Sequence, residues 1–272
     1  MQSSQSMNER ASQPQTKEAG ASLRISSGDV PRYSVYVWQW PVRITHWAIV
    51  ISIGVLTVTG LYIANPFIGT TGPASNQYLM GTMRFVHFLT AFVFTISVLF
   101  RIYWAFAGNK YARWNQFIPV QAARLRGLGR MLKFYLFIKR EPPATIGHNA
   151  LAGLTYTVIY LLFLVQIITG FALYSIPFLG GFWPAAFGWV FLLFDIPTVR
   201  VIHDVVMWLF LAFVIHHVYS AILVDIEEGS GVLSSIFSGY KSLTSRQLAE
   251  VRADEAATAK PAQAGKAGQE HA

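Results

Sequence analysis

Four long runs of apolar residues divide the chain, and each is bounded by polar, glycine or proline residues. Each run holds about 20 or more residues, enough to cross the hydrocarbon core of a bilayer as an α-helix. The pattern therefore predicts an all-α integral membrane protein, a bundle of four transmembrane helices. The predicted spans are residues 44–64, 83–107, 149–174 and 199–224.

A further apolar stretch, residues 176–194, is almost uncharged but is interrupted by Gly180, Gly181 and Pro184. It is also short for a span, since a transmembrane helix needs about 20 residues. We expect segment 175–198 to lie at the outer face, either partly re-entrant or docking a partner.

The two ends of the chain differ from this apolar middle. Residues 1–30 are rich in Ser and Gln, and residues 244–272 are rich in Ala, Gln and Lys. Both compositions are typical of disordered tails. The first 30 residues contain no apolar core after a charged start, so we expect no cleaved signal peptide. The predicted membrane domain is residues 31–243.

Lysine and arginine are sorted by loop. They occur before the first span, between the second and third, and after the fourth, whereas loops 65–82 and 175–198 have none. By the positive-inside rule, both termini and the central loop are expected in the cytoplasm. Within that loop, residues 124–140 mix basic residues with Leu, Phe and Tyr. This mixture predicts a helix lying on the inner membrane surface.

Composition narrows the chemistry. Hydrophobic residues make up 53% of the chain and charged residues 12%, whereas a soluble domain carries about 25% charged residues. The absence of cysteine excludes disulfides, cysteine-ligated iron–sulfur clusters, covalent haem attachment and thiol catalysis. The net charge of +8 comes from residues sorted by loop rather than by face. We therefore expect the positively charged loops to lie against a lipid bilayer, and we expect no binding of nucleic acid.

Two histidines in the last span suggest a redox role. His203 and His217 lie fourteen residues apart, a spacing that advances a helix by about 21 Å and returns to within roughly 40° of the same face. One helix can thus supply a ligand to each of two redox centres stacked across the membrane. Ionisable residues inside a span are costly, which makes them functional candidates.

Two further histidines complete the predicted ligand set. His46 lies near the cytoplasmic end of the first span and His87 near the outer end of the second. Depth pairs His46 with His217 on the inner side, and His87 with His203 on the outer side. We expect each pair to hold the iron of a non-covalent b-type haem. Alone, a histidine near the membrane boundary is usually interfacial, but four at matched depths favour ligation.

His216 is the alternative ligand beside His217. The two side chains differ by about 100° around the helix, and fourteen residues preserve the face of His203 better than thirteen. We therefore assign the inner ligand to His217.

Arginines near the span ends form a second group of candidates. Each could pair with a haem propionate, which needs a cation where the dielectric is low. The alternative for each is snorkelling to lipid headgroups. These arginines are Arg43, Arg84, Arg101 and Arg200.

Three of the glycines within the predicted spans are candidates for a close approach: Gly54 and Gly60 in the first span and Gly170 in the third. They could admit a flat macrocycle, but small residues in membrane helices more often serve helix–helix packing.

Several motifs resemble one protein family. RITHW at residues 43–47, followed by LTVTG at residues 56–60, resembles the first signature of the cytochrome b subunits of membrane-bound nickel–iron hydrogenases. RFVHF at residues 84–88 resembles their second-helix histidine motif. RVIH at residues 200–203, with His217-Val-Tyr, resembles their second signature. The resemblance covers about residues 33–243. It carries the haem ligands over to His46, His87, His203 and His217.

The resemblance implies a direction of electron flow. In this family, small and large hydrogenase subunits oxidise H2 in the periplasm, and electrons cross two haems to reduce quinone in the bacterial inner membrane. The motif Gly147-His148-Asn149 resembles a family motif at the start of the third span. His148 could hydrogen-bond a quinone carbonyl and deliver a proton, since histidine titrates near neutrality. The alternative is a helix-capping or interfacial histidine.

Other functions stay open at this level. A dihaem cytochrome b of formate dehydrogenase gamma type, or of thiosulfate reductase, would differ only in the docked partner. A haem-free proton-coupled transporter predicts discontinuous helices or internal repeats, and no repeat is evident in the sequence. A structural anchor gives no reason for histidines at matched depths.

Overall fold

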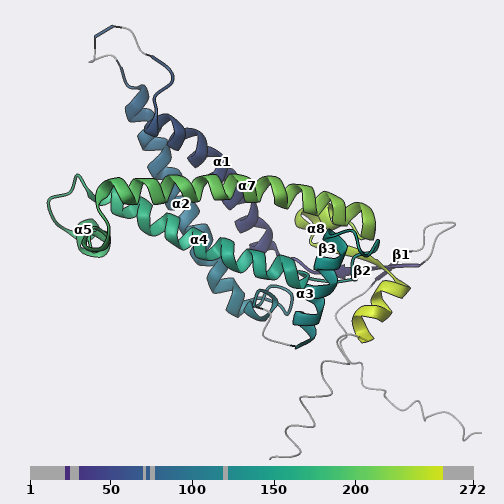
Figure 1. Ribbon diagram of the computed structural model, residues 1–272. Coiled ribbons are helices and arrows are strands. Elements are labelled where there is room, and N and C mark those ends of the chain that lie inside the picture. The colour runs from purple at the N-terminus through teal and green to yellow at the C-terminus, as the bar shows by residue number, and fades with distance from the viewer. Residues whose placement is uncertain (1–21, 25–30, 70–71, 74–76, 119–121, 254–272) are drawn as a thin grey trace, which may run out of the picture.

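The computed structural model describes residues 22–24, 31–69, 72–73, 77–118 and 122–253. The predicted tails therefore fall largely outside the described residues. Four long helices form the bundle (Figure 1), and each is long and apolar enough to cross a membrane. The four long apolar helices that the sequence predicts are thus confirmed. The helices are α1 (Trp40–Ala64), α2 (Leu79–Ala107), α4 (Ala150–Ser175) and α7 (Ile196–Glu228).

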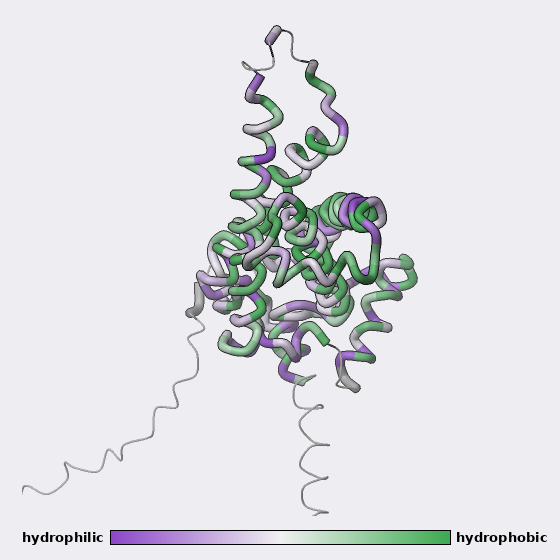
Figure 2. The backbone as a smooth tube through the Cα atoms, turned by 90° about the vertical axis from the view of Figure 1, so that its left-hand side faces the viewer, coloured by the Kyte–Doolittle hydropathy of each residue, from purple (hydrophilic) through white to green (hydrophobic). Residues whose placement is uncertain are grey.

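The helices form two hairpin-like pairs. Helix α1 packs on α2, α4 packs on α7, and α2 also contacts α4. Hydrophobic residues run along these helices (Figure 2), as expected for segments facing lipid and each other. Two start sites follow from capping, since the Asn149 side chain accepts from Ala152 N at 2.8 Å, and Asp195 accepts from Thr198 N at 3.0 Å. Gly229, in the left-handed region, ends α7.

Segment 176–194 folds back instead of crossing. It contains two short helices, α5 (Phe182–Phe187) and α6 (Val190–Leu193), so it is not a fifth span. Gly181, with φ of 90°, allows the turn into α5. Trp183 of α5 stacks on Phe171 of α4, with ring centroids 5.3 Å apart. The segment thus forms a cap at one end of the bundle, called here the α5 end (Figure 1).

The opposite end carries a small sheet, so the all-α prediction is incomplete. Strands β1 (Ser22–Arg24), β2 (Arg32–Tyr36) and β3 (Tyr240–Thr244) form an antiparallel sheet in the order β1-β2-β3. The pairing of β2 with β3 joins the segments flanking α1 and α7. Both segments therefore leave the bundle on one side, called here the sheet end.

The observed bounds of the surface helix and of the C-terminal tail differ from the predicted ones. Helix α3 (Ala122–Tyr135) occupies most of the range predicted for the surface helix. Residues 245–253 are helical, so the prediction of a disordered tail from residue 244 is wrong for this stretch. The cause is a capping box, in which Thr244 N donates to Gln247 Oε1 at 2.9 Å and Gln247 N donates to Thr244 Oγ1 at 3.3 Å. Helix α8 (Val232–Ser238) completes the sheet end.

A buried ion pair ties β3 to the end of α7. Lys241 Nζ lies 3.2 Å from Glu228 Oε2, and the two side chains are only 5% and 4% exposed. Lys241 also donates to the Thr145 carbonyl at 2.9 Å, and the Ser230 hydroxyl donates to Glu228 at 2.7 Å. The lysine thus ties β3 to two other segments of the sheet end, the end of α7 and the loop before α4.

Replacing Glu228 by Gln should lower the stability of the sheet end strongly. The change leaves Lys241 as a buried charge without its counter-ion, a loss that costs about 3–5 kcal/mol. We expect a clear drop in the thermal unfolding temperature of the purified protein in detergent. The matched control is Glu141→Gln, because its pair with Arg246 is 78% and 83% exposed and exposed pairs contribute little. Equal shifts in both variants would contradict the structural role of the buried pair.

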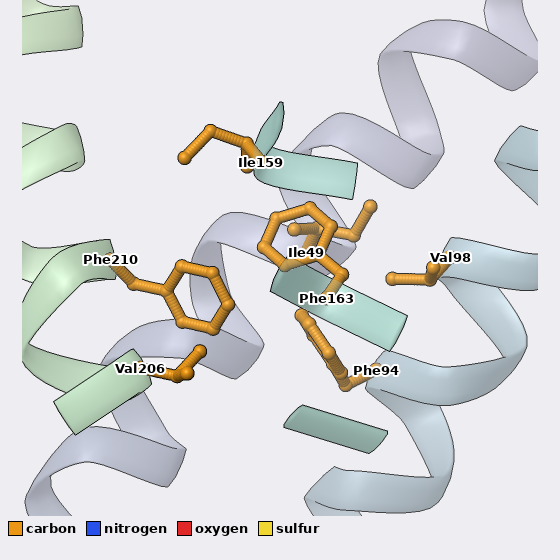
Figure 3. Packing of buried hydrophobic residues seen from close by; sticks show 7 residues of the cluster. All are labelled: Ile49, Phe94, Val98, Ile159, Phe163, Val206 and Phe210. Carbon is orange, nitrogen blue, oxygen red and sulfur yellow. The ribbon is translucent and has the colours of Figure 1, made fainter. Parts of the chain in front are cut away.

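The middle of the bundle is filled by a purely apolar cluster, called here the central plug. Phe163 lies at its centre, with ring centroids 5.1 Å from Phe94 and 5.0 Å from Phe210. Its side chains converge from all four long helices (Figure 3). The members of the plug are Ile49, Phe94, Val98, Ile159, Phe163, Val206 and Phe210.

Candidate functional site

The central plug divides two groups of polar side chains. On each long helix, one polar residue precedes the plug residues in sequence and another follows them. The group toward the sheet end, called the sheet-end site, consists of His46, Arg101, Tyr156 and His217. The group toward the α5 end, called the α5-end site, consists of Thr59, His87, Thr169 and His203.

In the sheet-end site, the rings of His46 and His217 face each other from α1 and α7. Their centroids lie 6.4 Å apart. Metal–imidazole bonds are about 2.0–2.1 Å long, so two rings sharing one metal have centroids about 6 Å apart. His46 Nδ1 is buried and, within the described residues, has no hydrogen-bond partner. The spacing fits a bis-imidazole haem.

The geometry separates His217 from its neighbour. His216 is exposed, and its Nε2 lies 3.4 Å from the Ser220 hydroxyl. His217 instead lies next to Tyr156 of α4, whose hydroxyl is 3.3 Å from His217 Nδ1. His217 therefore faces the bundle interior, and His216 does not.

In the α5-end site, His87 and His203 each rest on a threonine of the paired helix. His87 Nδ1 lies 2.9 Å from Thr59 Oγ1, and His203 Nδ1 lies 2.9 Å from Thr169 Oγ1. His203 Nε2 has the Gln166 amide nitrogen at 3.1 Å, so a haem iron bonded to Nε2 would replace this amide as its partner.

Two glycines make room for these rings. A Cβ added at Gly60 would lie 3.4 Å from His87 Cε1, and one at Gly170 would lie 3.1 Å from His203 Cε1. A Cβ at Gly54 would meet nothing within 4 Å. At Gly60 and Gly170 the absence of a side chain therefore leaves room for an imidazole of the neighbouring helix.

Comparison with known proteins decides the family. Residues 37–239 match the family described as prokaryotic cytochrome b561. The chain belongs to this family. Its resemblance to hydrogenase cytochromes, inferred from short motifs, is thereby confirmed, and as a b561 cytochrome it is a multi-pass membrane protein that binds haem b.

Relatives carry more specific names. The chain is 41% identical over 213 residues to a probable Ni/Fe-hydrogenase B-type cytochrome subunit of Cupriavidus necator, covering 77% of this chain and 87% of that protein. It is 39% identical over 215 residues to a probable Ni/Fe-hydrogenase 1 B-type cytochrome subunit of Escherichia coli K12, covering 77% and 91%. It is 38% identical over 234 residues to a protein of Bradyrhizobium diazoefficiens with the same name as the first, covering 82% and 95%.

The four arginines predicted to pair with a haem propionate differ in burial and in their contacts in this b561 cytochrome. Arg101 is only 5% exposed. Its guanidinium lies 3.5 Å from the Ala112 carbonyl and 5.1 Å from the centroid of the Phe117 ring, and neither contact supplies a negative charge. Arg43 donates to the Ser238 carbonyl at 2.9 Å. Arg84 and Arg200 are exposed at the α5 end. Arg101 is therefore the side chain that best fits a propionate in the interior.

His148 lies just before α4, outside the spans, and is packed among aromatic rings. Its ring centroid lies 4.6 Å from Trp38, 4.8 Å from Tyr156 and 5.5 Å from Phe117. Burial, followed by the positive charges of Arg101 and other cations, holds the pKa of His148 well below its ordinary value. His148 is therefore neutral at pH 7, unlike the expected side chain that titrates near neutrality. The helix cap is Asn149, not His148.

Tyr156, Thr59 and Thr169 were missed as candidates in the sequence. A signal for the threonines was present, because a Thr-Gly pair occurs at residues 59–60 and again at 169–170. Each pair is followed by an Arg-x-x-His motif, RFVH at 84–87 and RVIH at 200–203. The expectation that the chain has no repeat is therefore wrong for these short motifs.

Proposed function

We propose that this cytochrome holds two b haems and carries electrons across the membrane from a nickel–iron hydrogenase to quinone. One haem would be held by His87 and His203, the other by His46 and His217. The observation that carries the proposal is the placement of two histidine pairs on opposite sides of the apolar central plug. The hydrogenase is favoured as the electron donor because the relatives are named as its cytochrome subunits.

The orientation follows from charge. We place the sheet end in the cytoplasm, because the loops at that end hold the lysine and arginine residues that the positive-inside rule retains there. The α5 end then faces the periplasm of a bacterial inner membrane. The small and large hydrogenase subunits would dock on it, near the exposed apolar side chains of Leu179, Phe182 and Leu192.

Within this scheme the haems supply the one-electron chemistry, and the protein supplies ligation, burial and charge. The four imidazoles would hold the irons. The central plug excludes water between the two sites and fixes their separation. Arg101 gives a buried positive charge for a propionate, an interaction that is strong where the dielectric is low.

The quinone site is proposed at the sheet end, beside His148. A neutral His148 can donate a hydrogen bond to a quinone carbonyl, and its contact with Tyr156 links it to His217. The guanidinium of Arg124 lies 3.3 Å from the His148 carbonyl and holds this segment against α3.

Replacing His148 by Ala should slow quinone reduction about tenfold while both haems stay bound and reducible by H2. The estimate corresponds to the loss of one hydrogen bond of about 1–1.5 kcal/mol. Turnover would be followed by quinone absorbance in membranes supplied with H2. His148→Gln keeps an amide donor and is expected to retain more activity than the alanine variant. Unchanged turnover in His148→Ala would remove this residue from the quinone site.

The haem count tests the proposal directly. Alkaline pyridine haemochrome analysis of the purified chain should give two haem b per polypeptide, and a redox titration should show two components. A single haem, in protein purified without loss of colour, would contradict the paired arrangement.

A further inference from the structure

The two halves of the bundle repeat one local arrangement. In the first half, Thr59 of α1 lies against His87 of α2, and in the second, Thr169 of α4 lies against His203 of α7. In both, the distance from hydroxyl oxygen to Nδ1 is 2.9 Å, and the glycine after the threonine makes room for the ring. The threonine and histidine are separated by 28 residues in one half and 34 in the other. The match thus arises in three dimensions between neighbouring helices.

The donor in the hydrogen bond between Thr59 and His87 follows from the single proton of the threonine hydroxyl. A threonine hydroxyl has one proton to donate and two lone pairs to accept with. Thr59 Oγ1 lies 2.7 Å from the Val55 carbonyl of its own helix, which takes that proton. His87 Nδ1 must then be the donor to Thr59, so the proton of the neutral ring is on Nδ1. The lone pair on Nε2 is left free for a metal.

The second half gives the same result from more contacts. Thr169 Oγ1 lies 2.8 Å from the Val165 carbonyl, so it accepts a hydrogen bond from His203 Nδ1. The Gln166 amide nitrogen lies 3.1 Å from His203 Nε2. With its nitrogen on this side, the amide donates to an unprotonated ring nitrogen, which agrees with a lone pair on Nε2. Both threonines are buried, at 4% and 6% exposed, so water does not compete for these bonds.

The sheet-end histidines lack this arrangement. His46 Nδ1 is buried without a hydrogen-bond partner in the described part of the chain. His217 Nδ1 has the Tyr156 hydroxyl at 3.3 Å, a longer contact to a group that can donate or accept. The threonine-fixed imidazole is therefore a feature of the α5-end site.

We propose that Thr59 and Thr169 are a matched pair of positioning residues for the α5-end haem. Each fixes the orientation and tautomer of one axial histidine and, by accepting a hydrogen bond from Nδ1–H, strengthens that histidine as a donor to iron. A stronger donor stabilises the ferric state, so the pair holds the midpoint potential of this haem lower than the imidazoles alone would. This inference rests on the proposed ligation of that haem by His87 and His203.

The test is a redox titration of the full-length cytochrome carrying Thr59→Val or Thr169→Val. Valine keeps the shape of threonine but removes the hydroxyl. We expect the midpoint potential of one haem to shift to a more positive value in each variant, further in the double variant, while the other haem is unchanged. The electron paramagnetic resonance signal of that ferric haem should shift as well, because the imidazole orientation is released.

Two controls separate hydrogen bonding from packing. Thr59→Ser and Thr169→Ser retain the hydroxyl and should keep the wild-type potential. Thr95→Val removes a hydroxyl that bonds only the Ala91 carbonyl, at 2.7 Å, among its described contacts, and should shift neither haem. If Thr59→Val or Thr169→Val loses its haem, Thr59→Ala or Thr169→Ala is titrated instead. If the valine and the alanine variants at one position both lose one haem and the serine variant retains it, the result also supports a role of that threonine in positioning the axial histidine.

The outcomes distinguish this inference from the function on which it rests. Two bound haems with unchanged potentials in the double valine variant would overturn the positioning role and leave the dihaem proposal standing. A shift in both haems, or an equal shift in Thr95→Val, would overturn it as well. Retention of both haems in His203→Ala would instead overturn the ligation itself.

Discussion

Replacing His217 by alanine is expected to halve the haem b content and to abolish reduction of quinone by H2. The substitution removes one of two imidazoles whose ring centroids lie 6.4 Å apart across the sheet-end site. The remaining ligand, His46, cannot hold a low-spin haem alone. The proposed α5-end haem would lie on the other side of the central plug, so we expect it to stay bound and reducible by H2. Haemochrome analysis and a difference spectrum measure both effects.

The neighbouring residue provides a matched control. His216→Ala changes an exposed side chain that faces away from the sheet-end site. It should leave two haems and wild-type turnover. If His216→Ala lost the haem and His217→Ala kept it, the assignment of the inner ligand would be reversed.

Replacing His203 by alanine is expected to block electron entry altogether. The α5-end haem would be lost, and electrons from a hydrogenase docked on that side would have no acceptor within reach. The sheet-end haem should remain bound, but H2 should no longer reduce it. Only dithionite should reduce it. This result differs from that of His217→Ala, in which H2 still reduces the haem that remains. The pair of variants therefore reports the direction of electron flow.

Asp204→Asn is the control for this variant, since Asp204 is the exposed neighbour of His203 on α7. It should leave the spectrum produced by H2 unchanged. Reduction of the sheet-end haem by H2 in His203→Ala would mean that electrons enter without the α5-end haem. The proposed sequence of transfer would then be wrong.

Much of this architecture could be predicted from the order of the residues. Each span is an uninterrupted apolar run, and a bilayer permits only a helix for such a run. The fourteen-residue spacing of His203 and His217 fixes their face and depth through helix geometry alone. The pairing of His46 with His217 needed only depth, and the structure brings these rings together. The ligation itself stays a prediction.

What could not be predicted depends on contacts between distant segments. Strands β2 and β3 have five residues each, too few for a clear alternation of apolar and polar positions. Thr59 and Thr169 look like threonines that bond their own helix, which they also do. Only the packing of α1 on α2, and of α4 on α7, places their second lone pair against an imidazole. The capping box of Thr244 and Gln247, by contrast, has a sequence pattern that predicts a helix start at this position.

The transporter alternative is weakened by the same packing. Its discriminating features are broken helices and repeats that form a transport site at the midplane. Here the four long helices are continuous, and the midplane is filled by the apolar side chains of the central plug. The short repeat supports two histidines, which is the arrangement that a bis-imidazole haem requires.

The proposed function requires that electrons from H2 reach haem b in this chain. It is tested most directly by a difference spectrum of native membranes, with H2 as the only reductant and dithionite as the reference. We expect H2 to reduce the b-haem bands, and the bands to disappear when the gene is deleted. Haem that dithionite reduces and H2 does not would contradict the hydrogenase as donor, and membranes without these bands would contradict the cytochrome itself.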